Sequence, residues 1–223
     1  MASGIISTLA FLSLLGLNQA AGPNCEGLTK PLDLKDDYSS IMGRWIFTEG
    51  IADHDLFTNI LKTVSSSWVA FSPGSSKDTV ILTQGNKLNG TCEFQMDNTT
   101  IKNSTIYVTG VQMHIHISSS PYSSRSTANR RGLSEAEKEI PTEGNLIPSC
   151  PECLTFSFTS QVKNETVKSL YFFTRSPKVS ESEKDLYWKQ AACLGFRTEP
   201  QYSYDGVTEF CEKDQIKPED KKE

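Results

Sequence analysis

The sequence has few histidines and lacks the motifs that most enzymes carry. Three histidines occur in 223 residues, and there is no Gly-x-Ser-x-Gly, no His-Glu-x-x-His and no phosphate-binding glycine loop. His114 and His116 alternate with apolar residues, but no third metal ligand stands at a useful spacing. Two histidines on a solvent-facing or pocket-facing side of a strand are therefore favoured over a metal site. We expect no catalytic residue, no metal and no cofactor.

Concentrated positive charge is also lacking. The formal net charge is −5 at pH 7, and no basic stripe runs along the chain, so nucleic acid is not an expected partner. Beyond the N-terminus no apolar run approaches the ~20 residues that a membrane-spanning helix needs. We therefore expect no membrane insertion.

The N-terminus reads as a targeting segment. Residues 1–21 carry no charged side chain, and Ile5 to Leu17 are mostly apolar. This pattern is typical of a secretory signal peptide, and the apolar run is short for the alternative, a membrane anchor. Residues 22–211 then form one domain, followed by a charged, apolar-poor tail at 212–223 that we expect to be disordered. The mature chain is expected in extracellular fluid.

Cysteines and glycosylation motifs agree with that compartment. Six cysteines in an exported chain favour three disulfides over metal binding. A redox-active pair at Cys150 and Cys153 is disfavoured because no thioredoxin-like βαβ pattern surrounds it. Four Asn-x-Ser/Thr motifs predict N-glycosylation, with acceptors at Asn89, Asn98, Asn103 and Asn164.

Most of the domain consists of short apolar runs separated by turn residues, the pattern of an antiparallel barrel or sandwich. Eight strands are predicted, over residues 43–50, 66–72, 79–84, 91–97, 104–109, 111–118, 153–160 and 167–175. A long loop insertion is expected at 119–149, with a short helix over 133–140. It is interpreted as a surface loop; a binding or processing loop around Arg130 and Arg131 is the alternative.

Two further helices are predicted, and an irregular segment is expected at each end of the domain. Apolar residues at helical spacing predict one or two turns within 52–64, with Asp53 as a possible N-cap. Ser180 and Glu183 form a capping box for a helix that carries Cys193. Residues 22–41 and 195–210 lack sustained periodicity and are expected to be irregular.

The stretch from Met42 to Glu49 organises this pattern. Gly43 and Trp45 open the first strand, and Arg175 ends the last one. If these two strands meet where a barrel closes, the guanidinium can lie on the indole face. We expect Gly43, Trp45 and Arg175 to form the barrel floor.

These residues resemble those of the lipocalin family. The finer resemblance is to the orosomucoid and apolipoprotein M branch, including toxin-binding and organotin-binding relatives from fish plasma. It rests on the sequences Met-Gly-Arg-Trp at 42–45, Asn-Ser-Thr at 103–105, Cys-Pro-Glu-Cys at 150–153, Phe-Thr-Arg-Ser at 173–176, Lys-Gln-Ala-Ala-Cys-Leu at 189–194 and Glu-Phe-Cys at 209–211.

The resemblance implies an all-β, eight-stranded antiparallel up-and-down barrel with a C-terminal α-helix packed outside. It also implies a particular set of disulfides among the pairings that six cysteines allow. The implied pairs are Cys25 with Cys193, Cys92 with Cys211, and Cys150 with Cys153.

A barrel of this size leaves room for one small ligand. In the first strand, Phe47 and Glu49 share the parity of Trp45, and in the last strand Tyr171 and Phe173 share that of Arg175. The ligand-binding prediction comprises Phe47, Glu49, Trp68, Tyr171 and Phe173. The alternative is that these aromatic residues simply fill a core, and one bulge would reverse the parity.

The functional hypothesis is a secreted carrier of a small hydrophobic or amphipathic ligand: a lipid, steroid, xenobiotic or toxin. The alternative is an interaction or acute-phase immunomodulatory glycoprotein that acts through its surface and glycans. Lipoproteins or other plasma proteins are further partners to consider, and a monomer is expected.

Overall fold

The computed structural model describes residues 24–35, 37–108, 140–197 and 199–212. The strands are β1 (Gly43–Ala52), β2 (Val64–Pro73), β3 (Thr79–Leu88), β4 (Thr91–Lys102), β5 (Thr105–Val108), β6 (Thr142–Pro148), β7 (Cys153–Val162), β8 (Glu165–Thr174) and β9 (Tyr202–Ser203). The helices are α1 (Cys25–Thr29), α2 (Asp55–Leu61) and α3 (Glu181–Cys193), with a 3-10 turn η1 (Ser39–Ile41).

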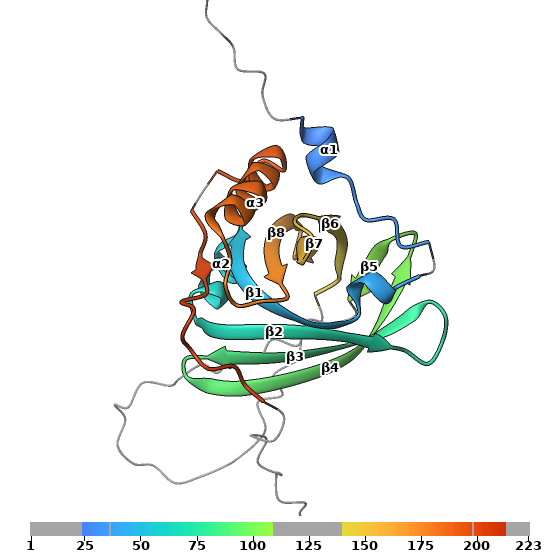
Figure 1. Cartoon of the computed structure of the whole chain (residues 1–223), viewed down its shortest axis with the longest axis horizontal. Helices are drawn as coiled ribbons and strands as arrows, with labels where there is room; N and C mark the ends of the chain where they lie inside the picture. Colours follow the sequence, from blue (N-terminus) through green and yellow to red (C-terminus); the bar gives the residue numbers. More distant parts are fainter. Residues whose placement is uncertain (1–23, 36, 109–139, 198, 213–223) are drawn as a thin grey trace, which may run out of the picture.

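The first eight strands form a closed barrel (Figure 1). Each strand from β2 to β8 pairs antiparallel with the next, and β8 pairs with β1. The barrel closes because residues 43–46 of β1 also pair with β2. The expected eight-stranded antiparallel barrel with a helix outside is confirmed.

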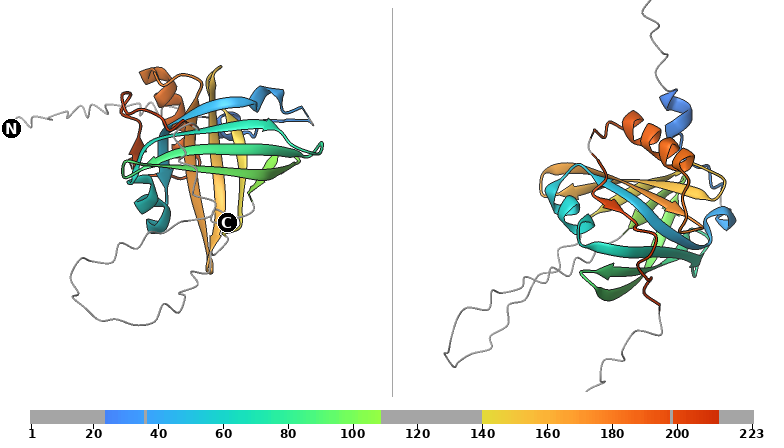
Figure 2. Two further views of the ribbon diagram at one scale, coloured as in Figure 1. Left: turned by 90° about the horizontal axis from the view of Figure 1, so that it is seen from below. Right: turned by 60° about the vertical axis from the view of Figure 1, so that its left-hand side comes forward.

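The two ends of the barrel differ. Since the strands run alternately up and down, η1 and the β2–β3, β4–β5 and β6–β7 connections share one end. The opposite end holds α2 and the β3–β4 and β7–β8 turns. Figure 2 shows the strands side by side between these ends. The start of β1 and the end of β8 therefore meet at the closed end.

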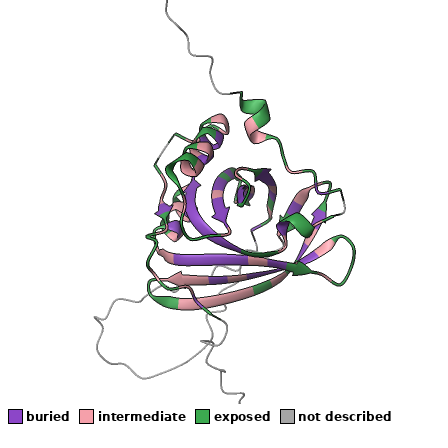
Figure 3. Cartoon of the chain, viewed as in Figure 1, coloured by how far each residue is buried: buried purple, intermediate pink, exposed green. Residues whose placement is uncertain are grey.

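Figure 3 shows buried residues along the strands of the barrel and on α3. The buried apolar residues form two clusters, which the alternation along the strands separates. The larger one lies on the inside of the barrel and includes Trp45, Phe71, Ile101 and Phe173. The smaller one lies on the outside, where Ile51, Leu170 and Phe172 pack under α3. Adjacent residues Phe172 and Phe173 thus serve opposite faces, as the period of two in a strand requires.

Helix α3 begins at the predicted capping box, in which Ser180 and Glu183 bond reciprocally. Tyr187 stacks on Phe172 with ring centroids 5.1 Å apart, and its hydroxyl donates to Leu170 O at 2.9 Å. Burial, helped by the nearby Glu49 charge, raises the pKa of Tyr187 well above its usual value, so this hydroxyl stays a donor. The helix is therefore docked on β8 by both packing and a hydrogen bond.

Several boundaries differ from the sequence-based expectation. The loop predicted over 119–149 was wrong at its C-terminal end, where Thr142–Pro148 form β6. Glycine and proline in that stretch hide its strand character, since both are depleted in strands. The strand predicted at 111–118, the helix at 133–140 and the Arg130 and Arg131 motif lie outside the described residues.

The helix predicted after β1 is present as α2, but its cap differs from the predicted one. The cap of α2 is His54, whose Nδ1 accepts from Leu56 N at 3.1 Å. The predicted cap, Asp53, instead accepts a hydrogen bond from Lys168 N through Oδ1 at 2.7 Å. That bond fixes the end of β1 to β8, so Asp53 belongs to the sheet rather than to the helix.

The segments at the two ends of the domain are more ordered than expected. The N-terminal arm, expected to be irregular, contains α1 and η1. After α3, β9 pairs with β1 beyond the point where β2 leaves it, and the following segment crosses the outside of β2 to β4 (Figure 1). Residues 1–21, the predicted signal peptide, and most of the predicted tail lie outside the described residues. Within the described part, no helix has the length and apolar character to cross a membrane.

Candidate functional site

The closed end of the barrel is built around Trp45 and Arg175. The Arg175 guanidinium carbon lies 3.4 Å from the centroid of the indole, on its face. Its Nη1 donates to Arg44 O at 2.9 Å and its Nη2 to Met42 O at 2.8 Å. Trp45 Nε1 donates to Ile41 O at 2.8 Å. Nη1 and Nη2 of Arg175 and Nε1 of Trp45 all donate to backbone carbonyls, so these side chains hold the end of the barrel together as a structural floor.

Gly43 is required beside that floor. Its φ is +83°, a left-handed conformation that favours glycine. A Cβ atom at this position would lie 3.3 Å from Arg175 Nη1. Glycine at position 43, two residues before Trp45, therefore allows both the left-handed backbone conformation and the close approach of the Arg175 guanidinium.

Aromatic rings line the inner side of β1, β2, β7 and β8, and Tyr202 of β9 stacks on Phe47. Phe47 lies 5.1 Å from both Tyr171 and Phe173 between ring centroids, and Phe156 lies 4.5 Å from Phe173. Phe158 extends the set toward the open end, 5.6 Å from Tyr171. We call this set the aromatic wall; its members are Phe47, Phe71, Phe156, Phe158, Tyr171, Phe173 and Tyr202. Three of the predicted ligand contacts, Phe47, Tyr171 and Phe173, belong to it.

Two tyrosines of the wall stay neutral. Burial raises the pKa of Tyr171, with a partial offset from the Ser169 side chain. Burial also raises the pKa of Tyr202, whose hydroxyl donates to Phe47 O at 3.3 Å. The wall therefore presents rings and neutral hydroxyls.

Glu49 does not face the barrel interior, contrary to the prediction. The pairing of β1 with β8 shifts between Phe47 and Glu49, so that Phe47 opposes Phe173 and Glu49 opposes Phe172. This bulge turns Glu49 to the outside, where Lys184 Nζ lies 3.3 Å from its Oε1. The alternation read from the sequence was reversed by one extra residue.

Trp68 also lies outside the barrel. Its neighbour Val69 belongs to the interior cluster, and Trp68 Nε1 donates to Cys211 O at 2.7 Å on the outer surface. The Arg44 guanidinium covers the ring at 4.6 Å from its centroid. Trp68 thus anchors the segment after β9, and its assignment to the ligand site was wrong.

The strands β3 and β4 carry polar side chains on their inner face. Leu82 belongs to the interior cluster and pairs with Asp97, so Asp97 shares its face. The same parity places Glu93, Gln95 and Thr99 inward. We call this group the polar wall; its members are Gln84, Asn86, Glu93, Gln95, Asp97 and Thr99.

Sequence reasoning missed the polar wall. Polar and apolar residues alternate in 91–97, a pattern that favours the apolar side as the inner one, yet Phe94 and Met96 lie on the outer face, and Met96 is 61% exposed. Cys92 gave a usable signal, because a bond to the segment after the last helix requires an outward position. Its disulfide with Cys211 fixes the parity of the strand.

Asp97 and Thr99 of the polar wall each have one side-chain oxygen that lacks a hydrogen-bond partner among the described residues. The atoms are Asp97 Oδ2 and Thr99 Oγ1, and both are buried. Burial raises the pKa of Asp97 above its usual value, and a hydrogen bond from the Gln95 side chain partly offsets this. The two atoms are two residues apart on one inward face.

The disulfides have the pairs that the family resemblance implied. Cys25 joins Cys193, tying α1 to α3, and Cys92 joins Cys211. The third joins Cys150 and Cys153 at the floor end of β7. Glu183 lies near this last pair, but its sulfurs are bonded to each other and are not free thiolates. The histidines considered for a metal site, His114 and His116, lie outside the described residues.

The four predicted glycosylation acceptors are all exposed. Asn89, Asn103 and Asn164 lie in the turns between successive strands, and Asn98 lies on the outer face of β4. Their exposure gives them the accessibility that N-glycosylation requires.

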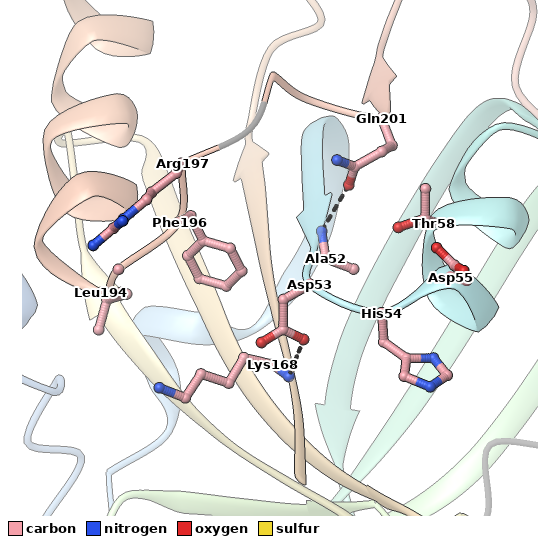
Figure 4. Close-up of a pocket in the computed structure, with 11 residues that line it drawn as sticks. Ala52, Asp53, His54, Asp55, Thr58, Lys168, Leu194, Phe196, Arg197 and Gln201 are labelled. Atoms are coloured by element: carbon pink, nitrogen blue, oxygen red, sulfur yellow. Dashed lines mark hydrogen bonds between the residues drawn. The ribbon is translucent and has the colours of Figure 1, made fainter. Parts of the chain in front are cut away.

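A separate surface pocket of about 450 Å³ lies outside the barrel, beside the start of α2 (Figure 4). Asp53, His54 and Lys168 line one side, and Phe196 and Arg197 line the other. Asp53 is bonded to Lys168 N, and Gln201 Oε1 accepts from Ala52 N at 2.8 Å. These bonds join the strands and the segment after α3, so the pocket's polar groups already serve the fold.

Comparisons with known proteins agree with this architecture. The chain is similar to saxitoxin and tetrodotoxin-binding proteins 2 and 1 of Takifugu pardalis, each 26% identical over 215 residues that cover 92% of this chain. The match covers 49% of each relative, so the chain spans about half their length. No family model matches the sequence.

A solved lipocalin structure shares the fold. Lipocalin 12 from rat epididymis superposes with a TM-score of 0.50 and 9% identity, over 74% of this chain and 82% of that one. The siderocalin Ex-FABP gives 0.48 and 10%, over 75% and 91%. Placement in the orosomucoid and apolipoprotein M branch stays a prediction. The chain has the lipocalin fold and resembles, along nearly its whole length, toxin-binding proteins of Takifugu pardalis.

Proposed function

We propose that this chain is a secreted, non-enzymatic carrier that binds one small apolar or amphipathic molecule inside its barrel. The observation that carries the proposal is the aromatic wall inside a closed barrel, opposite strands whose inner face is polar. An eight-stranded barrel is just wide enough to hold one small ligand. Rings supply contact area, and polar groups supply orientation.

The relatives support binding as the activity. Both matched proteins of Takifugu pardalis are named for binding saxitoxin and tetrodotoxin. This chain covers about half of their length, so the comparison does not extend to the rest of those proteins. We extend to this chain the binding of a small molecule, with toxins, lipids, steroids and xenobiotics as candidate ligands.

Disulfides and exposed sequons support export. Three disulfides close the described part of the fold. Such bonds persist in oxidising compartments and are rare in the cytosol. The four exposed acceptor asparagines have the accessibility that glycosylation requires. Analysis of the protein from its native fluid for N-glycans and for a mature N-terminus near residue 22 tests this part.

The second candidate is an interaction glycoprotein that acts through its surface. The exposed sequons favour it, because glycans at Asn89 and Asn164 would both stand at the open end of the barrel. Under this alternative, removing the glycans would abolish partner binding, and the barrel would bind no small molecule. Under the carrier proposal, the deglycosylated protein keeps its ligand.

The test uses the neutral fluorescent probe N-phenyl-1-naphthylamine, which brightens in apolar sites. We expect saturable binding to the full mature protein. Phe158→Ala, on the inner face and only half-buried, should weaken binding by about three- to tenfold through loss of ring contact. Met96→Ala on the outer face of β4 is the matched control and should change nothing. No saturable binding, or equal effects of the two variants, would overturn the carrier proposal.

A further inference from the structure

We infer that Asp97 and Thr99 form a buried anchor that selects a ligand with a cationic hydrogen-bond donor, an ammonium or guanidinium group, and disfavours carboxylates. This inference rests on the proposed function, since it specifies the ligand class of the same barrel interior. It assigns the selectivity to two neighbouring inward positions of β4.

The first step concerns the unmet hydrogen bond of Asp97. Its Oδ2 is buried and has no partner among the described residues. A buried carboxylate oxygen without a donor costs free energy, and polar groups in folded proteins are ordinarily paired. A donor supplied by a ligand would remove that cost, and a cationic donor would also offset the charge.

Thr99 adds a second, independent acceptor. Its side chain is completely buried, at 0% exposure, and Oγ1 has no partner among the described residues. Thr99 pairs with Val80 of the interior cluster, so its hydroxyl lies on the same inward side as Asp97. Ammonium and guanidinium groups carry several N–H donors and can serve two acceptors together.

The charge of the interior favours a cation. On the inner face of the described strands, the ionisable acids are Glu93, Asp97 and, at the rim, Glu165. Glu165 Oε2 lies 3.6 Å from His54 Nε2 of the segment before α2. No lysine, arginine or histidine of these described strands shares that face. Arg175 lies at the floor and is already engaged by the indole and two carbonyls. A carboxylate ligand would meet like charge without compensation, which is unfavourable at low dielectric.

The aromatic wall suits the rest of such a ligand. The rings of Phe156, Phe158 and Tyr171 present faces and edges to the interior. Aromatic faces attract cations as well as apolar groups. Burial keeps Tyr171 neutral, so the wall adds no negative charge that would pull the cation away from Asp97. The geometry therefore points to an amphipathic cation, with its apolar body on the rings and its charge on β4.

The experiment compares three octyl compounds as competitors of N-phenyl-1-naphthylamine: octylguanidinium, its neutral isostere octylurea, and octanoate. We expect octylguanidinium to compete about tenfold or more better than octylurea, the size of a charge-assisted hydrogen bond, and octanoate to compete worst. Asp97→Asn should bring octylguanidinium and octylurea within about twofold. Thr99→Val should reduce the preference in part.

Binding of the probe to the wild type distinguishes failure of the proposed carrier function from failure of the proposed cation selectivity. Asp97→Asn and Thr99→Val should retain the far-ultraviolet circular dichroism of the wild type, which shows that they fold, and competition in each variant is referred to that variant's own affinity for the neutral probe. Asp78→Asn, in the exposed turn before β3, controls for the loss of one negative charge and should keep the full preference. If the wild type does not bind the probe, the proposed function fails. If it binds the probe but octylguanidinium and octylurea compete equally, this inference alone fails.

Discussion

Glu49 on β1 and Lys184 on α3 form an ion pair across the outside of the barrel, with 3.3 Å between Oε1 and Nζ. Glu49 is 3% exposed, and its Oε2 accepts from Ser203 Oγ at 2.5 Å. One buried carboxylate thereby joins a strand of the barrel, the outer helix and the short strand β9. The bulge that reversed the predicted parity thus creates a structural tie.

Lys184→Met should lower the free energy of unfolding by about 1–3 kcal/mol, because it leaves the Glu49 charge buried with a single partner. The range is below that of a fully buried pair, since the Lys184 side chain is 34% exposed. Urea unfolding measures the loss. Lys189→Met, which breaks the exposed pair with Asp185, is the control and should cost about 0.5 kcal/mol or less. Equal costs, or weaker probe binding by Lys184→Met, would contradict this account.

A second prediction concerns the floor. Arg175→Lys keeps the charge but cannot reproduce two parallel N–H donors and a planar group on the indole of Trp45. We expect a loss of about 2–3 kcal/mol in the free energy of unfolding. Near-ultraviolet circular dichroism should report the changed indole environment. The control is Arg44→Lys, because the Arg44 guanidinium lies over Trp68 on the outer face; it should cost about 1 kcal/mol or less. A larger cost at Arg44 than at Arg175 would contradict the assignment of Arg175 to the floor.

Much of the fold could be predicted from local signals. The start of the first strand, with Gly43 and Trp45, and the end of the last barrel strand, with Arg175, were predicted to meet at the barrel floor. The structure brings these residues together. The helix after β8 was predictable because Ser180 and Glu183 form a capping box, a sequence pattern that marks a helix N-terminus. Both features depend on local patterns that can be recognised without knowing the tertiary structure.

The orientation of side chains was less predictable. Glu49 was misplaced because the shift between Phe47 and Glu49 leaves no mark in the sequence. In β4 the inward side is polar, so the usual rule that apolar residues face the core fails there. In both strands, the pairing with neighbouring strands, rather than the residue type, decides which side chains face the barrel interior. In β4 the reversal falls on the site that we propose binds a ligand.

A third prediction concerns Gln190, a polar residue with 1% exposure. Its Nε2 donates to Leu28 O and Pro148 O, and its Oε1 accepts from Thr155 Oγ1 and Ser149 Oγ. Gln190→Met leaves those groups without partners and should cost about 2–4 kcal/mol. Thermal and urea unfolding measure it.

The double variant Gln190→Met with Thr155→Val discriminates between an unpaired-group penalty and a packing defect. Thr155 is 0% exposed, so its hydroxyl has no access to water after the single change. Removing both partners should recover part of the lost stability, since no buried hydroxyl is then orphaned. Simple additivity of the two single costs would show that packing, and not hydrogen bonding, explains the role of Gln190.

The last prediction links the proposed anchor to stability. Burial raises the pKa of Asp97 above 3.8 in the folded protein, so the folded state binds more protons than the unfolded state in the window between those two pKa values. Stability therefore falls as pH rises through that window and stays lower above it. Asp97→Asn lacks this dependence. The free energy of unfolding of Asp97→Asn minus that of the wild type should therefore be larger (the variant relatively more stable) at pH 7 than at pH 3.5.

Urea unfolding of the ligand-free protein from pH 3.5 to 7 measures the difference, with Asp78→Asn at an exposed position as the control. The slope with pH is the readout, because the hydrogen bond with Gln95 also changes in the variant. A difference that grows as pH falls would mean that the folded protein stabilises the Asp97 charge through a partner of its own. A carboxylate already satisfied in that way has no need of a ligand's cation, so the proposed anchor requires the opposite slope.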